Sequence, residues 1–192
     1  MVEETLSFDD KMRIIRERCD RFAIPFVQNE DEFRYVHDLI KEAGVYSYLE
    51  VGTAEGNSLI MFGSLFKFIK TIDLEEAHTK QARINANTIL NKNEIVIFNI
   101  GGDSTIIEKE EEKKYYLKYD VVYIDGGHDY TTVRSDSIRY APLANKLVLW
   151  HDICLPEVRA AYEWFKKRYP AGKYSEYIKS ETYGYGILEV GK

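Results

Sequence analysis

The feature that most constrains the fold is a regular alternation of short apolar segments with longer amphipathic ones from residue 46 onward. Five segments have the length and composition of buried strands, namely 46–51, 68–72, 94–100, 120–124 and 146–150. Each is followed by a segment with helical periodicity, namely 58–66, 75–90, 108–116, 131–140 and 156–169. Strands that alternate with helices form a parallel sheet with helices on both faces. The sequence therefore predicts an α/β fold.

Both ends of the chain extend this pattern. Two amphipathic helices are predicted at Phe8 to Phe22 and Asn29 to Ala43, with Gly44 as the stop of the second. Two strand-like runs, 174–179 and 185–190, are separated by a short link and predict an antiparallel pair. No repeat or flexible linker divides the chain. We therefore expect one domain over 1–192, in which helices within 1–44 are candidates to cover a substrate and 45–192 binds a cofactor.

Composition excludes several classes of protein. The 192 residues are 45% hydrophobic and carry a net charge of −6. A nucleic-acid partner calls for a basic face, and no apolar run is long enough to span a bilayer. Cys19 and Cys154 provide no disulfide framework, and the acidic N-terminal residues lack the apolar core of a signal peptide. We expect a cytoplasmic protein that binds neither nucleic acid nor membrane, with an oligomeric state that the sequence leaves open.

The first predicted strand leads into a glycine-containing turn, Glu50-Val51-Gly52-Thr53-Ala54-Glu55-Gly56-Asn57-Ser58. Ligands of open parallel sheets bind at the carboxyl ends of the strands, and glycines let the backbone approach them closely. Ala54 replaces the second glycine of the dinucleotide fingerprint, and a carboxylate at Glu50 would repel a pyrophosphate but attract an ammonium. The turn thus favours an amino-acid-bearing nucleoside over NAD, with a tight turn that binds nothing as the alternative. The candidate cofactor-binding residues here are Glu50, Gly52, Thr53, Gly56, Asn57 and Ser58.

Acids also follow the second and third strands. Asp73 is placed to accept hydrogen bonds from two ribose hydroxyls, or else to cap the next helix. Asp103, between Gly102 and Ser104, is placed to accept from an adenine amino group, or else to cap a helix near Glu108.

Acids and imidazoles follow the fourth and fifth strands. Asp125 and His128 lie in Ile124-Asp125-Gly126-Gly127-His128-Asp129-Tyr130, and His151 and Asp152 follow Trp150. Adjacent parallel strands would bring these four side chains together, and carboxylate and imidazole ligands suit a divalent metal. Turn and capping roles for the same residues are the alternatives.

The ordered set of motifs resembles class I S-adenosylmethionine-dependent methyltransferases over residues 46 to 152. Ile-Asp-Gly-Gly-His-Asp-Tyr and the later Trp-His-Asp-Ile resemble the branch of macrocin O-methyltransferases and cephalosporin hydroxylase-type proteins, and catechol-type O-methyltransferases are more distant. The resemblance implies a Rossmann-like, mostly parallel seven-stranded sheet with an antiparallel C-terminal strand pair. It also implies O-methylation of a small-molecule hydroxyl, on a sugar or natural product, with Mg²⁺ or another divalent metal assisting.

The resemblance further implies a role for each motif. Glu50 and Gly52 would face the methionine part of the cofactor, Asp73 its ribose, and Asp103 and Ser104 its adenine. Asp125 would contact the cofactor and take part in catalysis. The metal would be held by Asp125, His151 and Asp152, and His128 would act as the base. In catechol-type relatives a lysine stands at the position of His128, and Asp-Asn stands where this chain has His-Asp.

Three other functions fit parts of the pattern. A non-catalytic S-adenosylmethionine-binding protein would keep the strand-end acids, whereas a nicotinamide-dependent oxidoreductase is disfavoured by Glu50 and Ala54. A metal-dependent hydrolase would leave the glycine-containing turn unexplained. Tyr130, Trp150, Tyr183 and Tyr185 are candidates for substrate contact.

Overall fold

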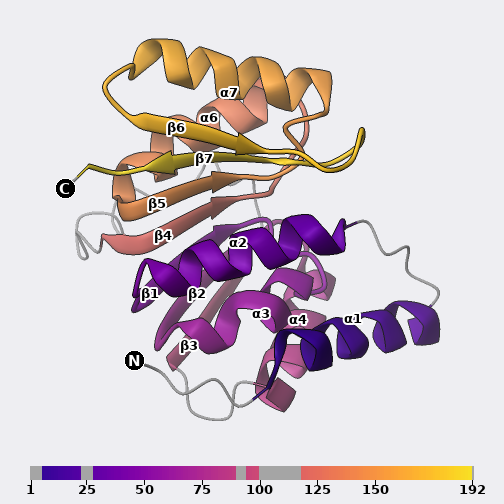
Figure 1. Cartoon of the computed structure of the whole chain (residues 1–192). Coiled ribbons are helices and arrows are strands. Elements are labelled where there is room, and N and C mark those ends of the chain that lie inside the picture. Colours follow the sequence, from indigo (N-terminus) through magenta and orange to yellow (C-terminus); the bar gives the residue numbers. More distant parts are fainter. Residues whose placement is uncertain (1–5, 23–27, 90–93, 100–117, 192) are drawn as a thin grey trace.

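The computed structural model describes residues 6–22, 28–89, 94–99 and 118–191. One seven-stranded sheet runs through it in the order β3-β2-β1-β4-β5-β7-β6 (Figure 1). The strands are β1 (Ser47–Val51), β2 (Phe68–Asp73), β3 (Glu94–Asn99), β4 (Tyr119–Ile124), β5 (Ala144–Trp150), β6 (Lys173–Tyr177) and β7 (Tyr185–Glu189). The first five are parallel, while β7 is antiparallel to β5 and to β6. The predicted α/β fold, strand count and antiparallel pair are confirmed.

The helices cover both faces of the sheet. They are α1 (Phe8–Phe22), α2 (Glu30–Glu42), α3 (Asn57–Phe62), α4 (Glu76–Ile89), α6 (Tyr130–Tyr140) and α7 (Pro156–Arg168). Single 3-10 turns occur at η1 (Gly63–Leu65) and η3 (Ala141–Leu143). One core cluster joins α1, α2 and α3 to one face, and a second joins α6 and α7 to the other (Figure 1). Alternate residues of β1 supply both clusters, because successive strand side chains point to opposite faces.

The N-terminal helices are part of this core. Phe33, Val36 and Ile40 of α2 are fully buried beside α3, and Ile15 of α1 is fully buried as well. Asn29 caps α2, its side chain accepting a hydrogen bond from the backbone N–H of Glu32. The helices α1 and α2 are therefore part of the hydrophobic core, whether or not they also cover a substrate.

The structure departs from the predicted elements at one helix. The predicted helix 58–66 is wrong in its second half, because α3 ends at Phe62 and the chain continues as one 3-10 turn from Gly63. Glycine is a poor helix former, since it loses more backbone freedom than other residues. The predicted helix 108–116 lies outside the described residues. No described helix is long and apolar enough to cross a bilayer.

Candidate active site

The carboxyl ends of β1, β4 and β5 meet in register. Val51 pairs with Ile124, which pairs with Trp150. Beyond the strands, the N–H of Asp125 donates to Val51 O at 2.8 Å and the N–H of His151 donates to Ile124 O at 3.1 Å. The residues that follow these strands are therefore brought side by side by the sheet itself.

The glycine-containing turn lies against this edge. Gly52 has a φ of +92°, and a Cβ built on it would lie 2.0 Å from the carbonyl oxygen of Asp125. Gly56 has a φ of +82° and begins α3 next to Ala82 of α4, 3.3 Å from its hypothetical Cβ. The backbones at Gly52 and Asp125 thus come so close that only glycine fits at position 52.

Asp73 ties the turn to β2. Its Oδ2 accepts a hydrogen bond from the N–H of Ala54 at 2.8 Å, and its Oδ1 accepts from the N–H of Glu75 at 2.8 Å. Its Oδ1 also lies 3.3 Å from Nδ1 of His78. Asp73 therefore bonds the backbone just before α4, which begins at Glu76, and a carboxylate with several lone pairs retains capacity for a ligand hydroxyl.

Glu50 lies beneath the turn and is fully buried. Its carboxyl group accepts hydrogen bonds from the hydroxyls of Ser58, Thr71 (2.7 Å) and Tyr48 (3.2 Å). Burial raises the pKa of Glu50 to about 8, against the lowering effect of the Ser58 and Thr71 hydrogen bonds. Glu50 thus supports the turn from inside the protein. The prediction that it faces the methionine part of the cofactor is wrong for this structure, because its side chain is fully buried among these hydroxyls.

An acid–imidazole cluster forms where β4 and β5 end. Nδ1 of His151 lies 3.1 Å from Oδ1 of Asp125, with hydrogen-bond geometry, and 3.2 Å from Oδ1 of Asp152 as a charge contact. Nε2 of His128 lies 2.9 Å from Oδ2 of Asp152. One donor atom each from Asp125, His128 and Asp152 lie within 4.8 Å of one another. These four residues are the ones that the strand-end argument predicted to converge.

The charges of this cluster are strongly coupled. Burial by itself would lower the pKa of His151, but the Asp125 and Asp152 carboxylates raise it well above its usual range. Burial opposes ionisation of Asp152, yet the two imidazoles close to its carboxylate hold its pKa below the usual range. The same contact with Asp152 raises the pKa of His128. The cluster is therefore a set of carboxylates with two imidazole partners, one buried and one exposed.

The central part of the chain matches a known protein family. A family model described as "Methyltransferase domain" matches residues 49–153, which is more than half of the chain. The chain belongs to the methyltransferase-domain family. No match was found among curated proteins.

Solved structures share the fold of this methyltransferase. An O-methyltransferase from Bacillus cereus, in complex with SAH, is 16% identical with a TM-score of 0.75, covering 98% of this chain and 93% of that one. The O-methyltransferase TomG from Streptomyces achromogenes, involved in tomaymycin synthesis and in complex with SAM, is 15% identical with a TM-score of 0.72, covering 100% of this chain and 92% of that one. At these identities the likeness establishes the fold.

Several predicted site residues lie away from the acid–imidazole cluster or outside the described part of the chain. Gly102, Asp103 and Ser104 lie outside the described residues. The prediction that Trp150 contacts substrate is wrong, because its side chain is fully buried among α6 and α7 and its Nε1 donates to Ser137 Oγ at 2.8 Å. Tyr183 is half-buried, with its ring nearly parallel to that of His151 at a centroid distance of 6.2 Å.

Beneath the acid–imidazole cluster, sequence reasoning missed the hydroxyl of Tyr123, and the prediction that Tyr185 contacts substrate is wrong, because Tyr185 is fully buried. The buried Tyr123 donates to Oδ2 of Asp125 at 3.1 Å, and its hydroxyl lies 3.3 Å from that of Tyr185. The available signal was spacing, since Tyr123 precedes Asp125 by two positions and strand residues two apart share a face.

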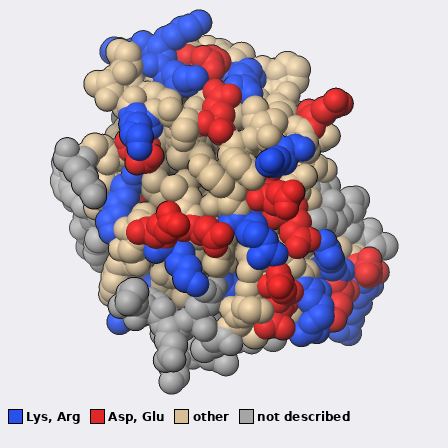
Figure 2. Space-filling model, in the orientation of Figure 1, with Lys and Arg blue, Asp and Glu red and all other residues tan. Residues whose placement is uncertain are grey.

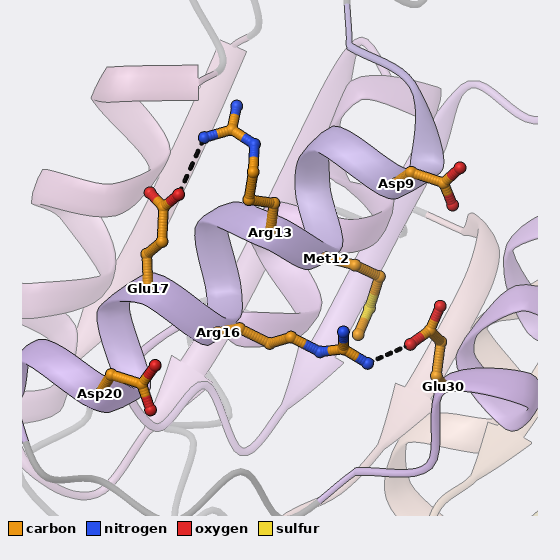
Figure 3. A pocket seen from close by; sticks show the side chains of 7 residues that line it. All are labelled: Asp9, Met12, Arg13, Arg16, Glu17, Asp20 and Glu30. Carbon is orange, nitrogen blue, oxygen red and sulfur yellow. Dashed lines mark hydrogen bonds and ion pairs between the residues drawn. The ribbon is translucent and has the colours of Figure 1, made fainter.

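A surface hollow of about 330 Å³ lies apart from these residues, along α1 (Figure 3). Its charged side chains pair with one another, Arg13 with Glu17 at 2.9 Å and Arg16 with Glu30. Both signs of charge are also interspersed over the face of the molecule in Figure 2. We interpret the hollow as solvated surface, because its own ion pairs satisfy both signs of charge.

Glu50→Gln should make the methyltransferase progressively more stable than the wild type as pH rises. The carboxyl pKa is raised in the folded protein, so the folded state holds the extra proton between the ordinary value near 4.5 and about 8. Stability from this group is present below the ordinary value and is lost as pH rises through the folded value. We expect the difference in unfolding free energy to grow by on the order of 4 kcal/mol between pH 5 and pH 9.

Urea unfolding of both proteins at several pH values measures this difference. The two proteins should be similar at pH 5, because glutamine resembles the protonated carboxyl group in shape and neutrality. A constant difference across the pH range would contradict the burial-raised pKa of Glu50.

Proposed function

We propose that this methyltransferase uses S-adenosylmethionine and transfers its methyl group to a hydroxyl oxygen of a small molecule, such as a sugar or natural product. The observation that carries the proposal is the close approach of Gly52 to the Asp125 carbonyl. It makes the glycine-containing turn and the acid–imidazole cluster immediate neighbours. A methyl donor over the turn would have its acceptor beside the cluster, as in-line transfer requires.

In this proposal the turn and the strand-end acids would hold the cofactor. Gly52, Thr53, Gly56, Asn57 and Ser58 would line its amino-acid end, with Glu50 holding the turn from beneath. Asp73 would accept from the ribose hydroxyls. Asp103, with Gly102 and Ser104, stays the proposed adenine border. The relatives in complex with SAH and SAM support the choice of cofactor.

The cluster fits a divalent cation. Asp125 and Asp152 offer hard carboxylate oxygens that lie within 4.8 Å of each other, and such ligands suit Mg²⁺ or Mn²⁺. We propose the two carboxylates as the main ligands, with His151 as a third donor once it has lost its proton. A bound ion would lower the pKa of a substrate hydroxyl.

His128 is the proposed proton acceptor. Its side chain is 53% exposed, so a substrate can reach it, whereas His151 is buried. The Asp152 carboxylate would stabilise the imidazolium that forms when His128 takes the hydroxyl proton. Asp125 would hold His151 in place and would lie next to the substrate hydroxyl that accepts the methyl group.

Thermal unfolding with S-adenosylmethionine, S-adenosylhomocysteine and NAD, each with and without Mg²⁺, tests this function. A ligand at a hundred times its Kd adds about 2.7 kcal/mol, which is a rise of roughly 5–11 °C for a domain of this size. We expect that rise with the two adenosyl ligands and no rise with NAD. We also expect a further increment with Mg²⁺.

Each other outcome points elsewhere. A rise with NAD alone would overturn the proposed cofactor. A rise with the adenosyl ligands but no methylated product from any hydroxyl acceptor would indicate a binding protein that has kept the fold.

A further inference from the structure

Two buried cationic side chains of α1 form hydrogen bonds with α3 and the turn that follows it. Lys11 and Arg18 are seven residues apart, so they lie on one face of α1. Lys11 is fully buried, and its Nζ donates to the carbonyl of Met61 at 3.1 Å and to Ser64 Oγ at 2.6 Å. Arg18 donates from Nη1 to Oδ1 of Asn57. The two cations therefore form hydrogen bonds at opposite ends of α3.

Arg18 is not satisfied by this contact. Its side chain belongs to a residue only 8% exposed, and its Nε is buried without a hydrogen-bond partner among the described residues. Desolvation lowers the pKa of Arg18, against the attraction of the Glu55 carboxylate nearby. A buried charge is costly unless it is paired, and a neutral amide is a weak partner for a guanidinium. Arg18 is therefore a buried cation with the Glu55 charge nearby, a hydrogen bond to a neutral amide and an Nε that has no hydrogen-bond partner among the described residues.

The position of Arg18 limits which anion would bind there. Asn57 belongs to the turn that begins at Gly52, so the guanidinium lies at the proposed amino-acid end of the cofactor. Glu55, on the same turn, contributes a negative charge close to Arg18. A pyrophosphate would be repelled by Glu55, whereas an amino acid brings both a carboxylate and an ammonium. An amino-acid zwitterion matches both signs.

We propose that Arg18 binds the α-carboxylate of the amino-acid portion of the cofactor. This inference rests on the proposed function and adds to it a named cofactor-binding residue outside the sheet and its turns. It gives α1 a role in ligand binding as well as in the core. A guanidinium forms charge-assisted hydrogen bonds with a carboxylate, which are stronger than bonds between neutral groups.

The test compares ligands that differ at the carboxylate. Calorimetry would measure Kd for S-adenosylhomocysteine, for its carboxamide and for 5′-methylthioadenosine, which lacks the amino acid. We expect wild type to prefer S-adenosylhomocysteine over its carboxamide, and Arg18→Met to weaken S-adenosylhomocysteine by roughly 10- to 100-fold. Binding of 5′-methylthioadenosine should change by less than about 2-fold, since its contacts do not include Arg18. Arg18→Lys should restore part of the loss.

Arg13→Met is the matched control, because it removes the same charge from the same helix at a side chain that is 61% exposed. It should bind all three ligands as the wild type does. An equal loss of all three ligands in Arg18→Met would overturn the proposal and assign Arg18 to the packing of α1. If that variant does not fold, the wild type decides, since equal affinity for the acid and the carboxamide would overturn it.

The same data separate this inference from the proposed function. Tight binding of 5′-methylthioadenosine without preference for the carboxylate refutes the role of Arg18 and leaves the cofactor intact. Failure of the wild type to bind any of the three ligands refutes both.

Discussion

Gly52→Ala is expected to leave little folded protein. The added Cβ would lie 2.0 Å from the carbonyl oxygen of Asp125, 2.4 Å from its carbonyl carbon and 2.7 Å from the Cα of Gly126. All three are backbone atoms of the loop after β4, so no side chain can turn aside. To relieve this clash, β1 and β4 would have to separate at the hydrogen bond that the N–H of Asp125 donates to the carbonyl oxygen of Val51. We expect a loss of more than about 4 kcal/mol, the range of severe steric changes.

Gly44→Ala isolates the effect of backbone conformation. Gly44 also has a left-handed φ, of +60°, but a Cβ there would meet nothing within 4 Å. Its substitution should cost only about 1–2 kcal/mol, the strain of a left-handed residue. Yield of soluble protein and urea unfolding measure both variants. If the two cost the same, Gly52 and Asp125 do not approach as closely as the structure has them.

Asp152→Asn is expected to reduce Mn²⁺ affinity by at least about 10-fold and methyl transfer by roughly 100-fold or more. Asp152 contacts both imidazoles, His128 at 2.9 Å and His151 at 3.2 Å, and asparagine removes its charge at nearly the same size. The φ of Asp152 is +57°, a conformation that asparagine adopts more readily than alanine does. The variant therefore tests the carboxylate without adding backbone strain.

Asp129→Asn supplies the matched control on the loop of His128. Asp129 caps α6 by accepting from the N–H of Thr132 at 3.0 Å, and asparagine is an equally good cap. It should keep Mn²⁺ affinity and rate within about 2-fold. Paramagnetic resonance titration measures Mn²⁺ binding, and a radiolabelled methyl donor measures transfer to a hydroxyl acceptor found by screening. Equal Mn²⁺ affinity in Asp152→Asn and wild type would refute the proposed metal ligands.

The layered fold was predictable because its signals are local. Strand and helix periodicity, with stops such as Gly44, located most elements to within a few residues. The convergence of Asp125, His128, His151 and Asp152 was also predictable, because parallel strands place their carboxyl ends on one edge.

Details of the site depended on contacts between segments distant in sequence. The sequence by itself determined the alternation of elements, the antiparallel pair and the acids at the strand ends. Only the tertiary structure decided that Glu50 is buried under hydroxyls, that Trp150 faces the core and that Arg18 meets Asn57. Periodicity gives the face of an element on which a side chain lies. Depth, partners and charge come from the elements packed against it, and those are fixed only when the whole chain has folded.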